Sequence, residues 1–108
     1  MIISRKNITI SEVKTDNEFN DAIKIYEEAF PEGEKRPIED IKHNIEENHE
    51  KMFIAMDNGV PVIFSMIWPV RDSDFLFLDY IAVRKDLPLN ILSPIFFTIN
   101  LIYYCNTQ

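Results

Sequence analysis

Glycine and cysteine are scarce in this chain, and their scarcity excludes several kinds of site. Only Gly33 and Gly59 occur among its 108 residues, so the sequence cannot form a P-loop or a Gly-x-Gly-x-x-Gly dinucleotide loop. Cys105 is the only cysteine, which rules out an intrachain disulfide and makes a cytoplasmic location the default expectation. It has no Cys or His partner at metal-ligand spacing, so no metal site is expected. No Gly-x-Ser-x-Gly nucleophile motif is present either.

Positive charge is also in short supply. The 11 Lys and Arg residues are outnumbered by 18 Asp and Glu residues, which gives a net charge of −7. This balance argues against nucleic acid as a partner, because such binding needs a basic face, and it disfavours adsorption to anionic lipid. An acidic surface suits a cationic partner such as an amine, although many proteins are acidic only for solubility. The first seven residues are too short and too quickly charged for a signal peptide.

The strongest structural signal is the run of residues 75–83. Its nine residues contain a single charge, Asp79, and are rich in aromatic and β-branched types. A short run that is apolar on both faces predicts a central strand covered on both sides. Strict alternation would place Asp79 in one row with Phe77, Ile81 and Val83, where a carboxylate costs free energy unless it is paired or hydrogen-bonded. This conflict between residue and position makes Asp79 the first candidate for chemistry.

Two helices are predicted before that strand. Thr15 opens a Thr-x-x-Glu capping box, after which apolar residues recur at helical spacing as far as Phe30. Pro31 ends this helix. Pro37 suits the first turn of a second helix, whose narrow stripe predicts a surface helix running to about Asn48. The first stripe consists of Phe19, Ala22, Ile23, Tyr26, Ala29 and Phe30, and the second of Ile38, Ile41 and Ile45.

Three further strands complete the expected fold. Residues 8–14 alternate weakly between apolar and polar types, which predicts a strand before the first helix. Residues 51–56 and 60–68 read as the two arms of a hairpin, and the Asn58-Gly59 pair between them favours a type I′ turn. The predicted order is therefore strand, helix, helix and three strands, in the α/β (α+β) class.

Two stretches resemble the GNAT-type N-acetyltransferase superfamily. Leu78-Asp-Tyr-Ile-Ala-Val83 is similar to the L-x-x-I-A-V pattern of that family's fourth strand, and Ala29-Phe-Pro-Glu-Gly-Glu-Lys-Arg-Pro37 is similar to the F-P-x-x-E-R-x-P linker between its first two helices. The resemblance covers about residues 8–86. It implies two helices packed on a mainly antiparallel four-stranded sheet, the N-terminal half of the acyl-CoA N-acyltransferase fold. It also implies acetyl transfer from acetyl-CoA to a primary amine on a small molecule or peptide.

The resemblance implies a set of site residues. The backbone of Ile81, Ala82 and Val83 would hold the pantetheine arm of acetyl-CoA. Asp79 would act as the base that removes the proton of the amine, although some members carry the carboxylate two residues earlier, at the position of Phe77. The alternative for Asp79 is a structural ion pair with a lysine or arginine.

Four further residues are candidates for contacting the acceptor. Glu32 and Arg36 match the linker, and Trp68 and Tyr80 could wall a pocket. Each also has a purely structural interpretation, because loop charges are usually solvated and buried aromatic residues usually belong to the core. His43 and His49 have no partner in the sequence pattern and are expected to be exposed.

The resemblance ends after Asp86. The family continues with a glycine-containing R/Q-x-x-G-x-G/A loop, whose backbone N–H groups bind the diphosphate at a helix N-terminus. Residues 84–94 of this chain contain no glycine, and Pro88 and Pro94 remove two backbone donors. All 29 charged residues precede Leu87.

Three interpretations of residues 87–108 stay open. They form a last element packed on the sheet, or an out-of-frame or truncated end, or a membrane anchor, which Pro88, Asn90, Pro94 and Asn100 disfavour. We expect truncation, which divides the chain into a GNAT-like half-domain, residues 1–86, and an atypical uncharged segment, residues 87–108.

Two functions follow from these observations. The first is a truncated or degenerate acetyltransferase that does not bind acetyl-CoA tightly or turn over by itself. The alternative is a non-catalytic interaction module, which would pair with another chain, including a second copy of itself, through the open edge of the strand ending at Val83 or through the apolar tail.

Overall fold

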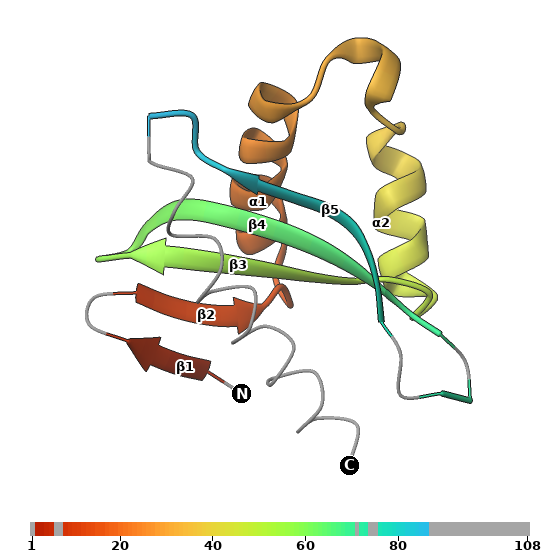
Figure 1. The fold of residues 1–108 in the computed structure, drawn as a ribbon, viewed down its shortest axis with the longest axis horizontal. Helices are drawn as coiled ribbons and strands as arrows, with labels where there is room; N and C mark the ends of the chain where they lie inside the picture. Colours follow the sequence, from red (N-terminus) through yellow and green to blue (C-terminus); the bar gives the residue numbers. More distant parts are fainter. Residues whose placement is uncertain (1, 6–7, 71, 74–75, 87–108) are drawn as a thin grey trace.

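One antiparallel sheet, two α-helices and a short 3₁₀ helix make up the described part of the protein. The computed structural model describes residues 2–5, 8–70, 72–73 and 76–86 (Figure 1). Five strands form a single sheet in the order β1-β2-β3-β4-β5, with every neighbouring pair antiparallel. The elements are β1 (Ile2–Arg5), β2 (Ile8–Glu12), α1 (Asp16–Ala29), the short 3₁₀ helix η1 (Glu32–Glu34), α2 (Ile38–Glu46), β3 (Lys51–Asp57), β4 (Val60–Pro69) and β5 (Leu76–Val83).

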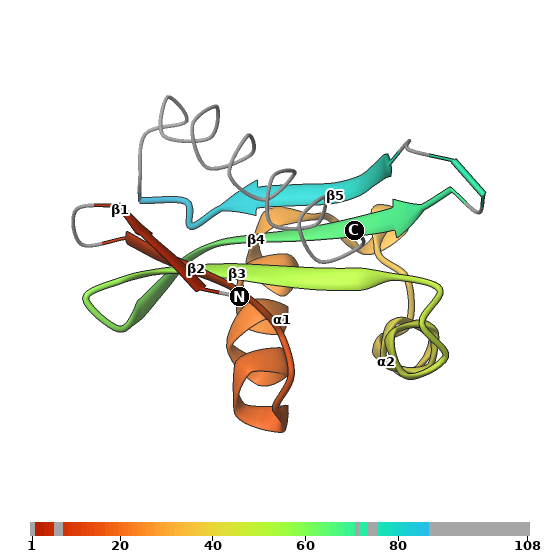
Figure 2. The same ribbon diagram turned by 90° about the horizontal axis from the view of Figure 1, so that it is seen from below.

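Both helices cover the same face of the sheet (Figure 2). The predicted α+β class and the order of the predicted elements are confirmed. The expected count of four strands was one too low, because β1 adds an edge strand beside β2. The interpretations of residues 87–108, and the assignment of Phe75 to the last strand, fall outside the described residues.

Local chemistry sets the ends of α1. The Thr15 hydroxyl accepts a hydrogen bond from the Glu18 backbone N–H at 3.1 Å, and the Glu18 carboxylate accepts one from the Thr15 N–H at 3.0 Å. This reciprocal pair is the predicted capping box, and the helix ends just before Pro31 as predicted. The predicted stripe needs two corrections: Ile25 is buried whereas Ile23 is only partly covered, and Ala29 at the end of the helix is exposed.

The second helix is shorter than predicted. It ends at Glu46 because the Asn44 carbonyl accepts the N–H groups of His49 and Glu50, which turns the chain back toward the sheet. Asn48 has a φ of 62° in this turn. Of the three isoleucines in its predicted stripe, only Ile41 is fully buried. No helix in the described ranges is long and apolar enough to cross a membrane.

The β3–β4 hairpin contains the predicted turn and an irregularity. Asn58 and Gly59 have φ values of 51° and 82°, and two consecutive positive φ angles are the signature of the type I′ turn. Beyond the turn, Ala55 pairs with Ile63 and Met56 with Pro61, so Val62 is an extra residue in β4. Such a β-bulge turns two consecutive side chains to one side. Accordingly, Val62 and Ile63 belong to the same apolar cluster.

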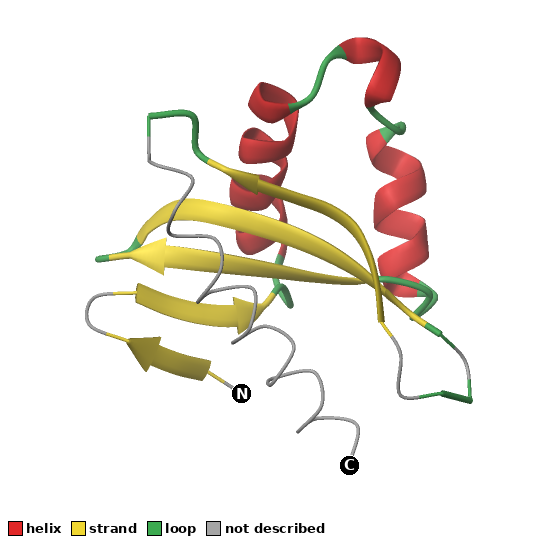
Figure 3. Cartoon of the chain, viewed as in Figure 1, coloured by secondary structure: helices red, strands yellow, loops and turns green. Residues whose placement is uncertain are grey.

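Figures 1 and 3 show the sheet lying across both helices. The core on the helix side packs α1 and Ile41 of α2 against β3, β4 and β5. A second apolar cluster lies on the other face of the sheet. Tyr80 and Ala82 of β5 belong to the helix side, and Ile81 and Val83 to the opposite face.

Candidate active site

A hydrogen-bonded connector between the two helices positions Arg36. The Tyr26 hydroxyl of α1 accepts the Arg36 backbone N–H at 2.5 Å and lies 3.4 Å from the Arg36 carbonyl oxygen, to which it donates. The Tyr80 hydroxyl of β5 donates to the Glu34 carbonyl at 2.9 Å. Two tyrosines from different elements therefore fix the connector over the sheet.

From this anchored connector the Arg36 side chain reaches two carboxylates. Its Nη1 and Nη2 atoms lie 2.8 and 3.1 Å from the two oxygens of Glu50, a bidentate pair, and Nη2 lies 2.7 Å from Asp79 Oδ2. The Glu50 side chain is fully buried, while those of Asp79 and Arg36 are 24% and 29% exposed. Asn44 Nδ2 adds a 3.3 Å hydrogen bond to Glu50. We call Arg36, Glu50 and Asp79 the ion cluster.

A second β-bulge aims Asp79 at the ion cluster. Met66 of β4 pairs with Tyr80, and the next residue, Ile67, pairs with Leu78, so Asp79 is the extra residue in β5. The bulge turns Asp79 to the helix side together with Tyr80. The expected row of Asp79 with Ile81 and Val83 is therefore wrong, because it assumed an unbroken two-residue period.

The surroundings of Asp79 in the ion cluster raise the pKa of its carboxyl above the ordinary value for aspartate. Burial raises the pKa of the Asp79 carboxyl, and so do the hydrogen bond and negative charge of Glu50, while the charge of Arg36 opposes the rise. For Arg36 itself, burial would lower the pKa, but hydrogen bonding and attraction to Glu50, with the charge of Asp79, leave its pKa raised. With both acids ionised, two negative charges share one positive charge. Asp79 is thus a partly exposed carboxyl suited to accept a proton.

Tyr80 forms the aromatic wall of the ion cluster. The Arg36 guanidinium carbon lies 5.4 Å from the centre of the Tyr80 ring, within range for a cation–π contact. The same ring packs edge-on against Phe30 and Tyr26, with centroids 4.9 and 5.2 Å away. Tyr80 therefore combines the two roles weighed from the sequence, core residue and wall of the site.

The remaining acceptor candidates do not join the ion cluster. Glu32 has a side chain that is 93% exposed and pairs with Lys35 at 3.1 Å. Trp68 lies near the end of β4, where its ring stacks on His49 with centroids 6.1 Å apart. His49 is exposed as expected, but its contact with an aromatic ring was not predicted.

The strand β5 lies at one edge of the described sheet. Among the described strands β5 is the last in the sheet, with β4 on one side only. The Arg84 N–H donates to the Val62 carbonyl of β4 at 2.7 Å. Alternation then turns the backbone groups of Ala82 toward β4, and those of Ile81 and Val83 toward the open edge. Two of the three residues expected to hold pantetheine thus offer backbone groups there.

Two members of this arrangement were not found by sequence reasoning. Glu50 directly precedes an apolar strand, and no spacing rule marks it as the partner of an arginine 14 positions earlier. Tyr26 was assigned to the core by its helical spacing, which is correct for its ring, but its hydroxyl also holds Arg36. Only the three-dimensional arrangement of the connector against the sheet shows both roles.

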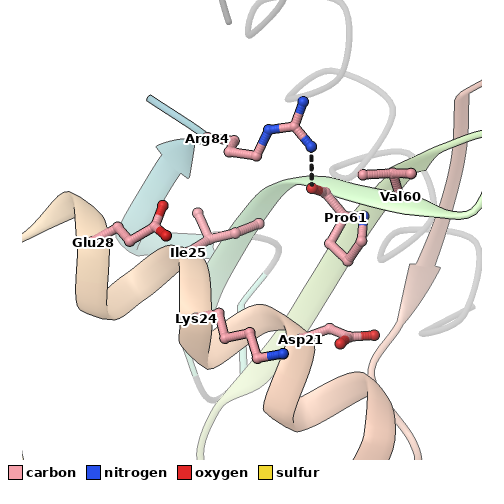
Figure 4. A pocket seen from close by; sticks show the side chains of 7 residues that line it. All are labelled: Asp21, Lys24, Ile25, Glu28, Val60, Pro61 and Arg84. Carbon is pink, nitrogen blue, oxygen red and sulfur yellow. Dashed lines mark hydrogen bonds between the residues drawn. The ribbon is translucent and has the colours of Figure 1, made fainter. Parts of the chain in front are cut away.

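A pocket of about 230 Å³ adjoins the end of β5 (Figure 4). Its charged lining comprises Asp21, Lys24 and Glu28 of α1 with Arg84. Arg84 Nε pairs with Asp86 at 2.6 Å, and Nη1 lies 3.5 Å from the Pro61 carbonyl. Two carboxylates in the lining, and a third bound to Arg84, leave no net positive charge for a diphosphate.

Comparison with known proteins identifies the fold. No family model and no curated protein matches the chain. Among solved structures there is a match, and it shows that the domain has a GNAT-type acyl-CoA N-acyltransferase fold, as the resemblance implied. The matching structure is the ribosomal-protein-S18-alanine N-acetyltransferase from Escherichia coli, with 25% sequence identity and a TM-score of 0.61. The match covers 79% of this chain and 51% of that enzyme, so the chain spans about half its length.

Proposed function

We propose that this chain carries the acceptor side of a GNAT-type N-acetyltransferase, which moves an acetyl group from acetyl-CoA to a primary amine. The observation that supports this most is the ion cluster: in a fold shared with an N-acetyltransferase, a β-bulge aims the partly exposed carboxyl of Asp79 beside an open strand edge. Asp79 accepts a proton from the bound ammonium, which leaves a neutral amine.

Acetyl-CoA supplies the acetyl group as a thioester. A carbon–nitrogen bond forms at the acetyl carbonyl and the carbon–sulfur bond breaks, and the departing coenzyme A thiolate takes up the proton that the nitrogen loses on becoming an amide. In this proposal a backbone N–H at the open edge of β5, from Ile81 or Val83, polarises the carbonyl oxygen. The ion pair with Arg36 holds the Asp79 carboxyl in place for the proton transfer, and Glu50 fixes Arg36 in turn.

The residues present fit one part of acetyl-CoA and not another. The open edge of β5 can hydrogen-bond the amides of pantetheine. The segment that follows lacks the glycines that let backbone N–H groups approach a diphosphate, and the pocket beside Arg84 has no net positive charge. The 108-residue chain by itself therefore does not bind acetyl-CoA tightly or turn over.

Calorimetry tests the cofactor half of the proposal. Titrating acetyl-CoA into the 108-residue chain is expected to give no saturable heat at micromolar concentrations. Saturable micromolar binding would show that residues 84–108 hold the diphosphate in some other way, and would overturn the assignment of inactivity.

A chimera tests the acceptor half. Residues 1–86 are joined to the segment that follows the corresponding strand in the E. coli enzyme, and acetyl-CoA binding confirms that the chimera is folded. The chimera is expected to acetylate a primary amine, and Asp79→Asn to lower kcat about a hundredfold. Glu46→Gln, the same change of charge on the exposed end of α2, is the matched control. A chimera that binds acetyl-CoA but acetylates no amine would refute the acetyltransferase assignment.

The open edge of β5 also supports the alternative, a non-catalytic module that pairs with another chain. Sedimentation over a hundredfold range of concentration separates the two proposals. A concentration-dependent oligomer that Val83→Pro abolishes would favour strand pairing, because proline removes a backbone donor from the open edge.

A further inference from the structure

An exposed aromatic surface lies at the end of β4, close to α2. A cavity of about 500 Å³ is lined by Asn48, His49, Trp68, Pro69 and Val70. Trp68 of β4 is 37% exposed, and Phe77, the residue of β5 that pairs with it, is 60% exposed. Solvent-facing aromatic side chains grouped beside a cavity are typical of a ligand site, whereas single exposed apolar residues need no explanation. We call His49, Trp68 and Phe77 the aromatic platform.

The platform lies on the same side of the sheet as Asp79. Trp68 and Phe77 are directly paired, so their side chains share a face. His49 stacks on Trp68 from the turn after α2, which identifies that face as the helix side. The bulge turns Asp79 to this side as well. Phe77 and Asp79 are only two residues apart in β5, and the bulge shortens the advance of the strand between them.

Charge determines what kind of group fits between the platform and the ion cluster. Two carboxylates share the single positive charge of Arg36, so the cluster attracts a cation. Glu50 is fully buried and already occupied by Arg36 and Asn44, whereas Asp79 is 24% exposed. Asp79 is therefore the carboxylate that a ligand can reach, with aromatic surface about two residues away.

We propose that the acceptor amine is a small arylalkylamine, whose ring packs on the aromatic platform and whose ammonium group binds Asp79. Phe77 and Asp79 are two residues apart and face the same side of the sheet, so one small molecule can contact both of them. The role of this ligand as an acceptor rests on the proposed acetyltransferase function, but its binding does not. The site assigns a different task to each residue: Asp79 selects the charge, and Trp68 with Phe77 selects the ring.

The fluorescence of Trp68 provides the test, because it is the only tryptophan in the chain. Phenethylamine is titrated into the 108-residue protein and compared with 2-phenylethanol, which lacks the charge, and with n-butylamine, which lacks the ring. Phenethylamine is expected to change the fluorescence saturably. Its Kd should be about fivefold lower than that of the alcohol and at least tenfold lower than that of butylamine.

Two variants locate the contacts. Asp79→Asn is expected to abolish the preference for the amine over the alcohol, and Phe77→Ser to reduce the preference for phenethylamine over butylamine. Glu46→Gln should change neither, and circular dichroism checks that each variant is folded. Equal affinities for the three compounds, or a preference for the amine that survives in Asp79→Asn, would overturn the proposal. Tenfold tighter binding of a peptide that begins with phenylalanine would overturn the small-molecule assignment.

This experiment contains no acetyl-CoA, so its result is independent of the transfer reaction. If the 108-residue protein binds phenethylamine selectively but the chimera acetylates no amine, the binding site is supported and the proposed acetyltransferase function is refuted. Acetylation of aliphatic amines without selective binding of phenethylamine would do the reverse.

Discussion

Arg36 and Asp79 are 43 positions apart in the sequence, yet Arg36 Nη2 lies 2.7 Å from Asp79 Oδ2. The contact joins the connector between the helices to the bulge in β5, the two regions where the sequence resembles the GNAT family. It explains how a carboxylate is tolerated within an apolar strand: the charge is paired with a guanidinium and kept partly in water.

Removing the guanidinium should destabilise the protein strongly. Arg36→Met leaves Glu50 buried without its cation, and breaking a buried pair in this way costs about 3 kcal/mol. Urea unfolding measures the loss. The double variant Arg36→Met with Glu50→Met should regain most of it, since a pair replaced by apolar residues of similar volume is often neutral. An Arg36→Met protein as stable as the parent would contradict this account of the ion cluster.

The raised pKa of Asp79 predicts how stability depends on pH. Burial, together with Glu50, raises this pKa above its ordinary value of 3.8, so the folded state holds the proton more tightly than the unfolded chain. The resulting stabilisation is complete below pH 3.8 and is lost as the pH rises through the folded-state pKa. Arg36, Glu50 and Tyr80 are the charged or titratable groups around Asp79 in the ion cluster and its wall.

The test of this linkage compares two proteins. Unfolding free energies of the parent and of Asp79→Asn are measured at a series of pH values from 3.8 upward. The difference between them should move in favour of the variant as the pH rises, because asparagine carries no titrating proton. Parallel curves would show that Asp79 has an ordinary pKa in the folded protein.

Removing one hydroxyl should loosen the connector. Tyr26→Phe deletes the acceptor for the Arg36 backbone N–H, which should cost about 1 kcal/mol. Hydrogen exchange of the Arg36 amide should become faster in the variant. Tyr80→Phe is the matched comparison, because it deletes the bond to the Glu34 carbonyl but keeps Tyr26 as the acceptor for the Arg36 amide. Unchanged exchange in Tyr26→Phe would mean that Tyr26 does not hold the connector.

The capping box of α1 provides a local prediction. Thr15→Ala removes the acceptor for the Glu18 N–H and should lower the free energy of unfolding by about 1 kcal/mol. Thr15→Ser keeps a hydroxyl and should recover most of that loss. The midpoint of urea unfolding distinguishes the three proteins, and equal midpoints for the alanine and threonine forms would refute the role of the cap.

The parts of the fold that local chemistry determines were predictable from the sequence. Thr15 begins a helix through its own side chain, Pro31 ends it through a steric clash, and Asn58 with Gly59 accepts the positive φ angles of a tight turn. Periodicity predicted both α-helices and the strands from β2 to β5 within a few residues, but not β1. The helix α2 ends before the predicted Asn48, because the Asn44 carbonyl accepts the N–H groups of His49 and Glu50.

The candidate site was predictable only in part. Arg36, Asp79 and Tyr80 were singled out from the sequence, and the structure brings them together. The bulge at Asp79 could not be foreseen, because it depends on how β5 aligns with Met66 and Ile67 of β4. Nor could Glu50, whose burial results from tertiary packing rather than from any pattern of neighbours.

Because Asp79 is an extra residue in β5, the alternation of side chains between the two faces of the sheet is shifted by one residue at this point. Deleting Leu78 would place Asp79 opposite Ile67, restore the two-residue period and turn the carboxylate away from the guanidinium, although every other side chain would be kept. The chemistry of this site therefore depends on the number of residues in one strand as much as on which residues they are. Insertions and deletions, which loops tolerate, would be as damaging here as the loss of a charge.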